Sequence, residues 1–363
     1  MKKAIAIAAA AAALSASAAH AQSSVAVYGI FDAGVEYLSH ANVAGQSLTR
    51  MPSLAGGMFP SRLGFRGTED LGGGLNAIFA LENGFQPDTG AVNQGGRFFG
   101  RQAWAGLSGA WGAFTAGRTY NMIYLSTFDT DVFGPSTYGL GALDPFIPNG
   151  RHDNSLSYKA TFNGLTVGAT YSVGRDVSAA GGPSGTNCPG ELAGNSRACR
   201  EWSAMLRYDA AAWGALAAYD RLNGGPNAAA GLTNGDLSDA RLHVAGYLKL
   251  DQWKLGAGML RRTNEGSATQ PRSNLSYVAA AYKVTPVVTV DGQLARLDYR
   301  DSANDAAQVL LRVMVDLSKR TTVYAAAGHI RNDGTSAVSL SSGGTVGAGL
   351  AQNGIIAGIK HSF

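Results

Sequence analysis

The segment Gly117–Arg151 carries the residues best suited to act on a solute. Its three carboxylates are Asp129, Asp131 and Asp144. It has no basic residue between its terminal arginines, and it has too many aromatic residues for a solvated linker: Tyr120, Tyr124, Phe128, Phe133, Tyr138 and Phe146. An ordered connection longer than about 15 residues is usually functional. We therefore expect a loop that folds into an enclosure and presents carboxylates there.

Other arrangements that could perform catalysis are incomplete. The chain has no G-x-S-x-G nucleophile motif. His152 adjoins Asp153, but neighbours on a strand point to opposite faces and cannot form the orienting pair of a triad. The run Gly72–Gly74 lacks the lysine and the helix of a phosphate-binding loop, so it indicates a turn. We expect no enzyme, no cofactor and no metal site.

The N-terminus predicts export. Residues 1–21 combine a charged start, a short apolar run and a small-x-small site, Ala19-His20-Ala21, as in a cleaved signal peptide. The expected mature chain is 22–363, and loss of Lys2 and Lys3 lowers the formal net charge from +4 to +2. Such a small excess of positive charge argues against a nucleic-acid partner.

Composition indicates a membrane barrel rather than a helical membrane protein. The chain has 49 glycines, only 15% charged residues and a mean hydropathy of −0.02. After residue 21 no apolar stretch reaches the roughly 20 residues of a membrane-spanning helix. An exported chain of this kind is typical of an outer-membrane β-barrel.

Alternating apolar and polar residues predict the strands. In the first, Val25, Val27 and Val35 share one face, and Asp32 and Glu36 share the other, as a water-filled barrel in lipid requires. Tight turns, the first at Glu69–Gly73, alternate with longer loops. The sixteen expected strands span 25–37, 59–68, 75–84, 98–109, 113–119, 152–162, 165–175, 200–210, 213–222, 238–250, 253–262, 273–284, 287–299, 307–318, 320–331 and 353–363.

A sixteen-stranded barrel has an aqueous lumen that something must narrow if the channel is to discriminate. The long third loop, 119–151, is the candidate. Elsewhere, Cys188 and Cys199 lie in a segment rich in Gly, Pro, Asn and Ser, where export favours a disulfide over free thiols.

Six motifs in order along the mature chain resemble the general diffusion porins of Gram-negative outer membranes, nearest the beta-proteobacterial type. They are SVAVYGIFDAGVEY, SRLGFRGTEDLGGGLNAIFALENGF, GRFFGRQAWAGLSGAWGAFTAGR, RHDNSLSY, DLSKRTTVYA and GIKHSF. The resemblance implies a homotrimer of sixteen-stranded antiparallel β-barrels in the outer membrane, each with its third loop folded into the lumen.

The resemblance also implies a constriction in which wall arginines face carboxylates. The corresponding arginines are Arg62, Arg101 and Arg151. The acidic side corresponds to Glu82 with Asp129 or Asp131, and either aspartate could reach the pore axis. The family's acidic-Phe-Gly-Gly loop tip is only partly kept, because Pro135 follows Gly134.

The strand pattern agrees for part of this set. Arg62 and Arg66 share the face opposite Leu63 and Phe65, so they point inward, and Glu82 lies on the polar face of its strand. An excess of arginine over carboxylate favours anions. The resemblance further implies that terminal Phe363 is a signal for the barrel-assembly machinery, although it could equally be an aromatic anchor at the lipid interface.

Together these patterns predict a porin for passive diffusion of small hydrophilic solutes and ions, embedded in outer-membrane lipid and lipopolysaccharide. A channel specific for one small carboxylate or sugar is the alternative, since Tyr120, Tyr124, Phe128 and Tyr138 could guide a solute. A surface adhesin is a further alternative, but the long loops at 176–199 and 332–352 carry few aromatic anchors.

Overall fold

The computed structural model describes residues 24–52, 56–178 and 185–363, so the expected signal peptide at 1–21 lies outside the described residues. The barrel strands are β1 (Ser24–Leu38), β3 (Arg62–Gly72), β4 (Leu75–Gly84), β5 (Gln102–Gly109), β6 (Gly112–Tyr120), β7 (Arg151–Phe162), β8 (Leu165–Gly174), β9 (Glu201–Asp209), β10 (Trp213–Asn223), β11 (Ser238–Leu250), β12 (Trp253–Asn264), β13 (Arg272–Lys283), β14 (Val288–Tyr299), β15 (Ala306–Asp316), β16 (Thr321–Asn332) and β17 (Gln352–Ser362).

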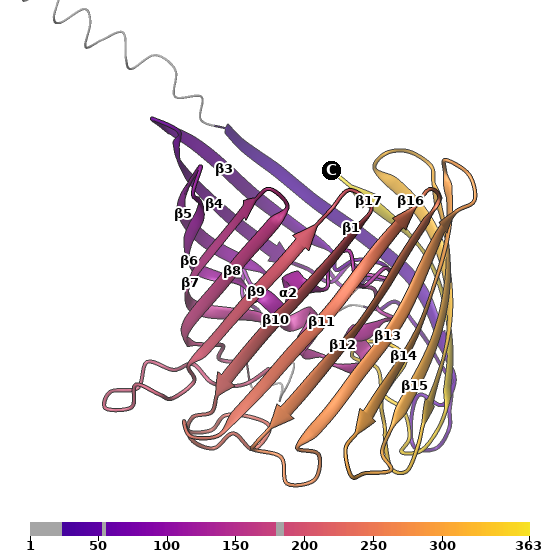
Figure 1. The fold of residues 1–363 in the computed structure, drawn as a ribbon. Helices are drawn as coiled ribbons and strands as arrows, with labels where there is room; N and C mark the ends of the chain where they lie inside the picture. Colours follow the sequence, from indigo (N-terminus) through magenta and orange to yellow (C-terminus); the bar gives the residue numbers. More distant parts are fainter. Residues whose placement is uncertain (1–23, 53–55, 179–184) are drawn as a thin grey trace, which may run out of the picture.

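These strands form one antiparallel barrel (Figure 1). Each pairs with its neighbours in chain order, and β1 pairs with β17, for example Val35 with Ala357, so the sheet closes on itself. The short strand β2 (Leu48–Arg50) adds to one end of β1. Within the described residues the predicted sixteen-stranded β-barrel is confirmed, with β2 as an additional short element.

The two faces of the barrel follow the predicted alternation. On β1, Val25, Val27 and Val35 are exposed on the outside, whereas Asp32 and Glu36 are fully buried within the barrel. An apolar exterior with a polar interior suits a barrel surrounded by lipid. No helix among the described residues has both the length and the apolar character needed to cross a membrane.

Two predicted boundaries near the start of the barrel are wrong. The second strand begins at Arg62 rather than Phe59, because the Asp32 carboxylate accepts hydrogen bonds from the backbone N–H groups of Gly57, Met58 and Phe59 and holds this segment out of the sheet. The same strand continues to Gly72 through an irregularity after Asp70, so Glu69 belongs to the strand and not to a turn.

Loop 3, residues 121–150 between β6 and β7, lies inside the barrel (Figure 1). It contains three short helices, α2 (Met122–Ser126), α3 (Leu140–Leu143) and α4 (Phe146–Asn149). Its aromatic and aliphatic residues form a buried cluster, which includes Phe133, Tyr138 and Phe146. The loop is therefore an ordered part of the interior, as its aromatic content predicts.

Candidate pore constriction

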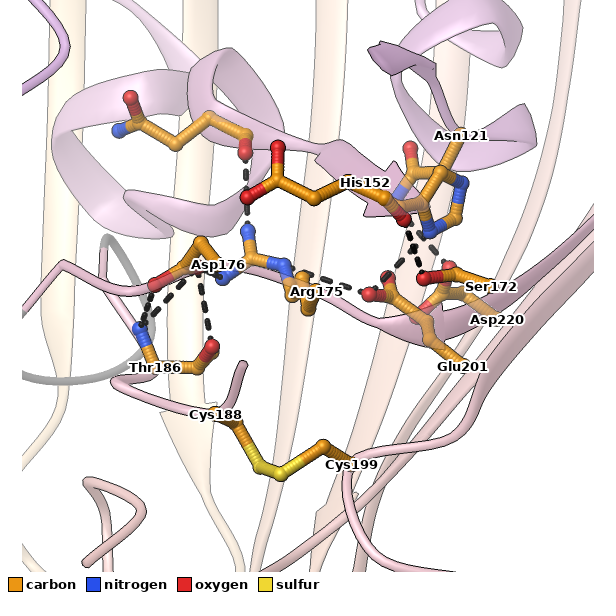
Figure 2. A network of polar contacts seen from close by, with 12 residues as sticks. Asn121, His152, Ser172, Arg175, Asp176, Thr186, Cys188, Cys199, Glu201 and Asp220 are labelled. Atoms are coloured by element: carbon orange, nitrogen blue, oxygen red, sulfur yellow. Dashed lines mark hydrogen bonds and ion pairs between the residues drawn. A yellow bond between two sulfur atoms is a disulfide. The ribbon is translucent and has the colours of Figure 1, made fainter. Parts of the chain in front are cut away.

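Loop 3 begins at a capped helix on the inner wall. Asn121 is the N-cap of α2, and its Oδ1 accepts a hydrogen bond from the Tyr124 N–H at 2.9 Å. The Asn121 amide donates to Asp220 on β10 at 3.1 Å (Figure 2). Helix α2 continues along the same wall, where Ser126 contacts His243 on β11, the neighbour of β10, at 2.6 Å. These contacts hold the first helix of loop 3 against β10 and β11.

Three ion pairs hold the next part of loop 3 to the barrel wall. Asp129 binds Arg207 and Lys254 at 2.7 and 2.9 Å. Asp144 binds Arg241 at 2.9 Å, in a buried pair.

The tip of loop 3 is attached on the opposite side, to the segment that follows β2. Ser136 donates its hydroxyl to the Gly57 carbonyl at 2.7 Å, and the Thr137 N–H donates to the same oxygen at 3.1 Å. Gly134 has φ +74°, and the Phe133 ring lies under the Arg312 guanidinium. Pro135 in place of a second glycine is therefore compatible with a docked tip.

The structure brings Arg62, Glu82 and Arg101 together on one wall. Arg101 Nε donates to Glu82 at 2.7 Å, and both side chains are buried. A Cβ on Gly84, which pairs with Arg62, would lie 2.2 Å from Gln94 Oε1 and 3.1 Å from Arg101 Cδ, so the glycine makes room for both side chains. Glu82 thus lies among the arginines, not opposite them as the resemblance implied, because β3, β4 and β5 are adjacent strands.

Arg151 joins the same wall through Tyr120. The Tyr120 hydroxyl accepts from Arg101 at 2.8 Å and from Arg151 at 3.3 Å, and the Arg151 guanidinium lies over the Tyr120 ring. Arg66, four residues along β3 from Arg62, lies over the Tyr28 ring inside the barrel. We call Arg62, Arg66, Arg101 and Arg151 the arginine wall.

The two candidate aspartates of loop 3 occupy different places. Asp131 lines a cavity of about 560 Å³ together with Arg101 and Arg151. Asp129 is not among the residues that line it, and it is held against β9 and β12 by its two cations. The structure thus places Asp131, and not Asp129, in the cavity that Arg101 and Arg151 also line, a distinction that strand periodicity could not make.

The environments of these aspartates give them different charges near neutral pH. Burial raises the pKa of Asp131 to about 6, although Gln293 donates a hydrogen bond to it at 2.7 Å. Burial would raise the pKa of Asp129 as well, but hydrogen bonds from Arg207 and Lys254 hold it at about 2. Asp131 is therefore the loop carboxylate that changes charge in the weakly acidic range.

Lowering the pH from 7.5 to 5 will accordingly increase the preference of the channel for anions. The raised pKa means that Asp131 is ionised above about pH 6 and neutral below it, so acid removes a negative charge from the cavity that Arg101 and Arg151 line. Reversal potentials across a salt gradient measure the change. Asp131→Asn should lose most of this pH dependence and Asp129→Asn should keep it, and the opposite pattern would contradict the assignment.

Sequence reasoning missed two arginines that line the same cavity. Arg97 and Arg118 both contact Asp153. The residue alternation could place Arg118 near the end of its strand. Its partner, Asp153, depends instead on the register between β6 and β7, which the sequence does not reveal.

His152 and Asp153 point to different partners, as predicted from their adjacency. His152 lies 3.2 Å from Glu201 on β9 (Figure 2). It also lies 2.9 Å from the Thr170 hydroxyl on β8. This acid, imidazole and hydroxyl are all buried, and none lines the cavity beside the arginine wall. We interpret the group as a polar network that joins β7, β8 and β9 on the wall beside the start of loop 3.

The remaining candidates lie away from the constriction. Cys188 and Cys199 form a disulfide in the connection between β8 and β9 (Figure 2). Phe363 exchanges two backbone hydrogen bonds with Gly29 of β1, at 2.9 and 3.1 Å, and its side chain is exposed. The C-terminal residue thus takes part in closing the barrel.

Comparison with known proteins decides the family. The chain matches the Gram-negative porin family over residues 8–335. This chain is a Gram-negative porin. Outer membrane porin protein 32 of Delftia acidovorans is 29% identical, and the match covers 94% of this chain and 95% of that protein. An outer-membrane porin of Bordetella pertussis is 37% identical, and that match covers 42% of this chain and 43% of the relative.

Solved structures agree with this family. An anion-selective porin from Comamonas acidovorans has a TM-score of 0.76 and 26% identity, and the match covers 94% of this chain and all of that chain. The Vibrio cholerae outer membrane protein OmpT shares the fold with a TM-score of 0.64 at 14% identity, over 94% of this chain and 98% of its own. This porin is therefore an outer-membrane channel for passive diffusion, and its family indicates a channel rather than an enzyme.

Proposed function

We propose that this porin prefers anions, and that the charge balance at its constriction is the cause. Among the described residues, Arg62, Arg66 and Arg151 of the arginine wall form no ion pair, whereas Arg101 is paired with Glu82. On the loop, Asp129 and Asp144 are paired with cations. The unpaired arginines therefore outnumber the one loop carboxylate that faces them, Asp131.

The mechanism of selection follows from the electrostatic field of these unpaired arginines. An anion approaching the arginine wall meets positive charge at short range in a narrow passage, where screening by water is reduced. Small hydrophilic solutes pass because polar residues line the lumen, and the arginines supply a bias in sign rather than a binding site. The anion-selective porin from Comamonas acidovorans, with which this chain shares 26% identity, supports the same direction.

The reversal potential of single channels in a planar bilayer under a tenfold salt gradient tests this proposal. We expect the sign of an anion-preferring pore. Arg151→Ala should lower the anion-to-cation permeability ratio about fivefold, because one charge at about 7 Å and intermediate screening contributes roughly 1 kcal/mol. Arg320→Ala, in a turn outside the lumen, is the control. A cation-preferring wild-type channel would refute the proposal.

A channel specific for one small carboxylate or sugar remains the alternative. The Tyr120 and Tyr124 rings are stacked 4.1 Å apart and both are buried, which suits fixing the loop better than guiding a solute. Solute flux that saturates, or current blocked by one solute at low concentration, would favour the specific channel over the diffusion pore.

Assembly and targeting follow the same family pattern. We infer a homotrimer in lipopolysaccharide-containing outer membrane, a signal peptide at 1–21 that is cleaved to leave 22–363, and recognition of Phe363 by the barrel-assembly machinery. The trimer form recorded for Vibrio cholerae OmpT supports the first inference. Cross-linking of the purified porin and N-terminal sequencing of the exported chain test the oligomer and the cleavage site.

A further inference from the structure

The two ends of loop 3 meet the barrel wall at one pair of carboxyl groups, Glu201 on β9 and Asp220 on β10 (Figure 2). At the start of the loop, the Asn121 amide donates to Asp220 Oδ2 at 3.1 Å. At its end, Arg175 donates to the Asn149 carbonyl at 2.8 Å, and its Nε lies 3.4 Å from Glu201 Oε2. Because both carboxyl groups are fully buried, water does not screen their charges from the ends of the loop.

The strand register brings these two carboxyl groups together. Asp220 pairs with Ser203, and Glu201 lies two residues before Ser203 on β9, so the two acids are diagonal neighbours on the inner face. Their side chains are in hydrogen-bonding contact. Within the described part of the chain, no N–H or O–H group donates to Glu201 Oε1 or Asp220 Oδ1. A hydrogen bond between two carboxyl groups requires a proton on one of them.

The hydroxyl and imidazole hydrogens beside the pair are already used. The Met122 N–H donates to the Ser203 hydroxyl at 2.9 Å, and that hydroxyl lies 2.5 Å from the Thr170 hydroxyl. Thr170 lies 2.9 Å from His152 Nε2, and Nδ1 of the same ring faces Glu201 at 3.2 Å. Each hydrogen has an acceptor when Ser203 donates to Thr170, Thr170 donates to neutral His152, and the imidazole Nδ1–H donates to the glutamate. These hydrogens are therefore not available to the contact between the two carboxyl groups.

The described groups around the pair supply too little positive charge for two carboxylates. The charged and titratable groups that face the pair or its cations are His152 on β7, Arg175 after β8, Arg241 on β11 and Asp144 of loop 3. Arg241 is already paired with Asp144 at 2.9 Å. Arg175 is paired with Asp176 at 2.9 Å, so its charge is divided between Asp176 and Glu201. One proton shared by the pair removes the charge that has no matching cation.

We propose that Glu201 and Asp220 hold one proton between them, and that this shared proton keeps loop 3 in place at the constriction. The two acids are positioning residues, because they act through Asn121 and Asn149 and do not touch the solute. Loss of the proton leaves two adjacent buried carboxylates, whose repulsion separates Asp220 from Glu201 and displaces both ends of the loop. The proposal concerns the position of loop 3 and does not depend on the anion preference.

Infrared spectroscopy of the purified porin tests the shared proton directly, because a protonated carboxyl group has a C=O stretching band separate from that of a carboxylate. We expect this band at pH 8, where Asp131 is ionised. The band should lose the same intensity in Glu201→Gln and in Asp220→Asn. Asp316→Asn removes an inward-facing carboxylate that accepts the Thr322 hydroxyl at 2.7 Å, and this matched control should keep the band.

Single-channel recording of the same variants tests the positioning role. Each amide can donate the hydrogen that the shared proton supplies in the wild type, and neither amide changes the net charge of the pair. Glu201→Gln and Asp220→Asn should therefore keep the wild-type conductance and reversal potential at pH 7.5. Between pH 7.5 and 10 the current noise of the wild type should rise severalfold as the proton is lost, and that of both amide variants should not. Asp220→Leu, which cannot accept the hydrogen bond from Asn121, should be noisy at every pH.

Three results would overturn the proposal. The first is a carboxyl band of equal intensity in the wild type and both amide variants. The second is a shift of the reversal potential toward anion preference in both amide variants at pH 7.5, because each would then have removed a full charge. The third is an equal rise of current noise with pH in the wild type and the amide variants. A cation-preferring wild-type channel, by contrast, would refute the proposed function and leave these comparisons intact.

Discussion

Replacing Arg101 by alanine will destabilise the folded barrel by about 3–5 kcal/mol, the cost of leaving one partner of a buried ion pair alone. Arg101 and Glu82 are joined at 2.7 Å, and their side chains are 1% and 3% exposed. Without Arg101, Glu82 keeps a hydrogen bond from the Tyr28 hydroxyl at 2.9 Å but loses its bonded cation. Urea unfolding in detergent micelles, followed by tryptophan fluorescence, measures the free energy of unfolding.

Two further variants distinguish the effect of breaking the Arg101–Glu82 ion pair from the effect of removing one arginine charge. Arg101→Ala/Glu82→Gln removes both charges and should recover most of the lost stability. Arg66→Ala removes an unpaired arginine from the same wall, so it should reduce anion preference while changing stability by less than about 1 kcal/mol. If Arg101→Ala were no less stable than Arg66→Ala, the buried pair would not have the role assigned to it.

Gly256→Val will narrow the channel, with a roughly twofold fall in single-channel conductance, because conduction depends on the free width of the constriction. Gly256 lies on the inner face of β12, and a Cβ there would lie only 2.1 Å from the Thr130 carbonyl oxygen of loop 3. Thr130 lies between Asp129 and Asp131, so both aspartates must move with it. The backbone of loop 3 can shift only away from the wall, into the lumen.

The control for this substitution lies on the opposite face of the barrel. Ala325→Val makes a similar increase in size at an exposed, outward-facing position of β16 and should leave conductance unchanged. Single-channel recordings in symmetric salt provide the comparison. Wild-type conductance in Gly256→Val would mean that loop 3 does not bound the narrowest part of the pore.

The alternation of residue types predicts which face of each strand meets water, and this part of the fold follows from sequence. Asp32 and Glu36 on β1, and Arg62 on β3, all face inward as expected. The start of β3 does not follow, because Phe59 has the composition of a strand residue but donates its N–H to a carboxylate 27 residues away. A local pattern cannot detect a competing partner of this kind.

The constriction, too, is only partly predictable from the sequence. Periodicity places Glu82 and Arg62 in the lumen, but the neighbour that Glu82 meets depends on the β4–β5 pairing and on the space left by Gly84. For Asp129 and Asp131, two residues apart in an irregular loop, no period applies. The partners Arg207 and Gln293, on different strands, determine which aspartate stays beside the cavity.

The attachment of loop 3 at both of its sides has a mechanical consequence. One side is tied to the wall at β9–β14 and the tip is tied to Gly57, which Asp32 in turn holds to β1. A beam supported at both ends bends far less under a given load than one supported at a single end. The current through this pore should therefore show little low-frequency noise and little dependence on applied voltage. Removing the hydrogen bond from the Ser136 hydroxyl to the Gly57 carbonyl should convert a steady current into a fluctuating one.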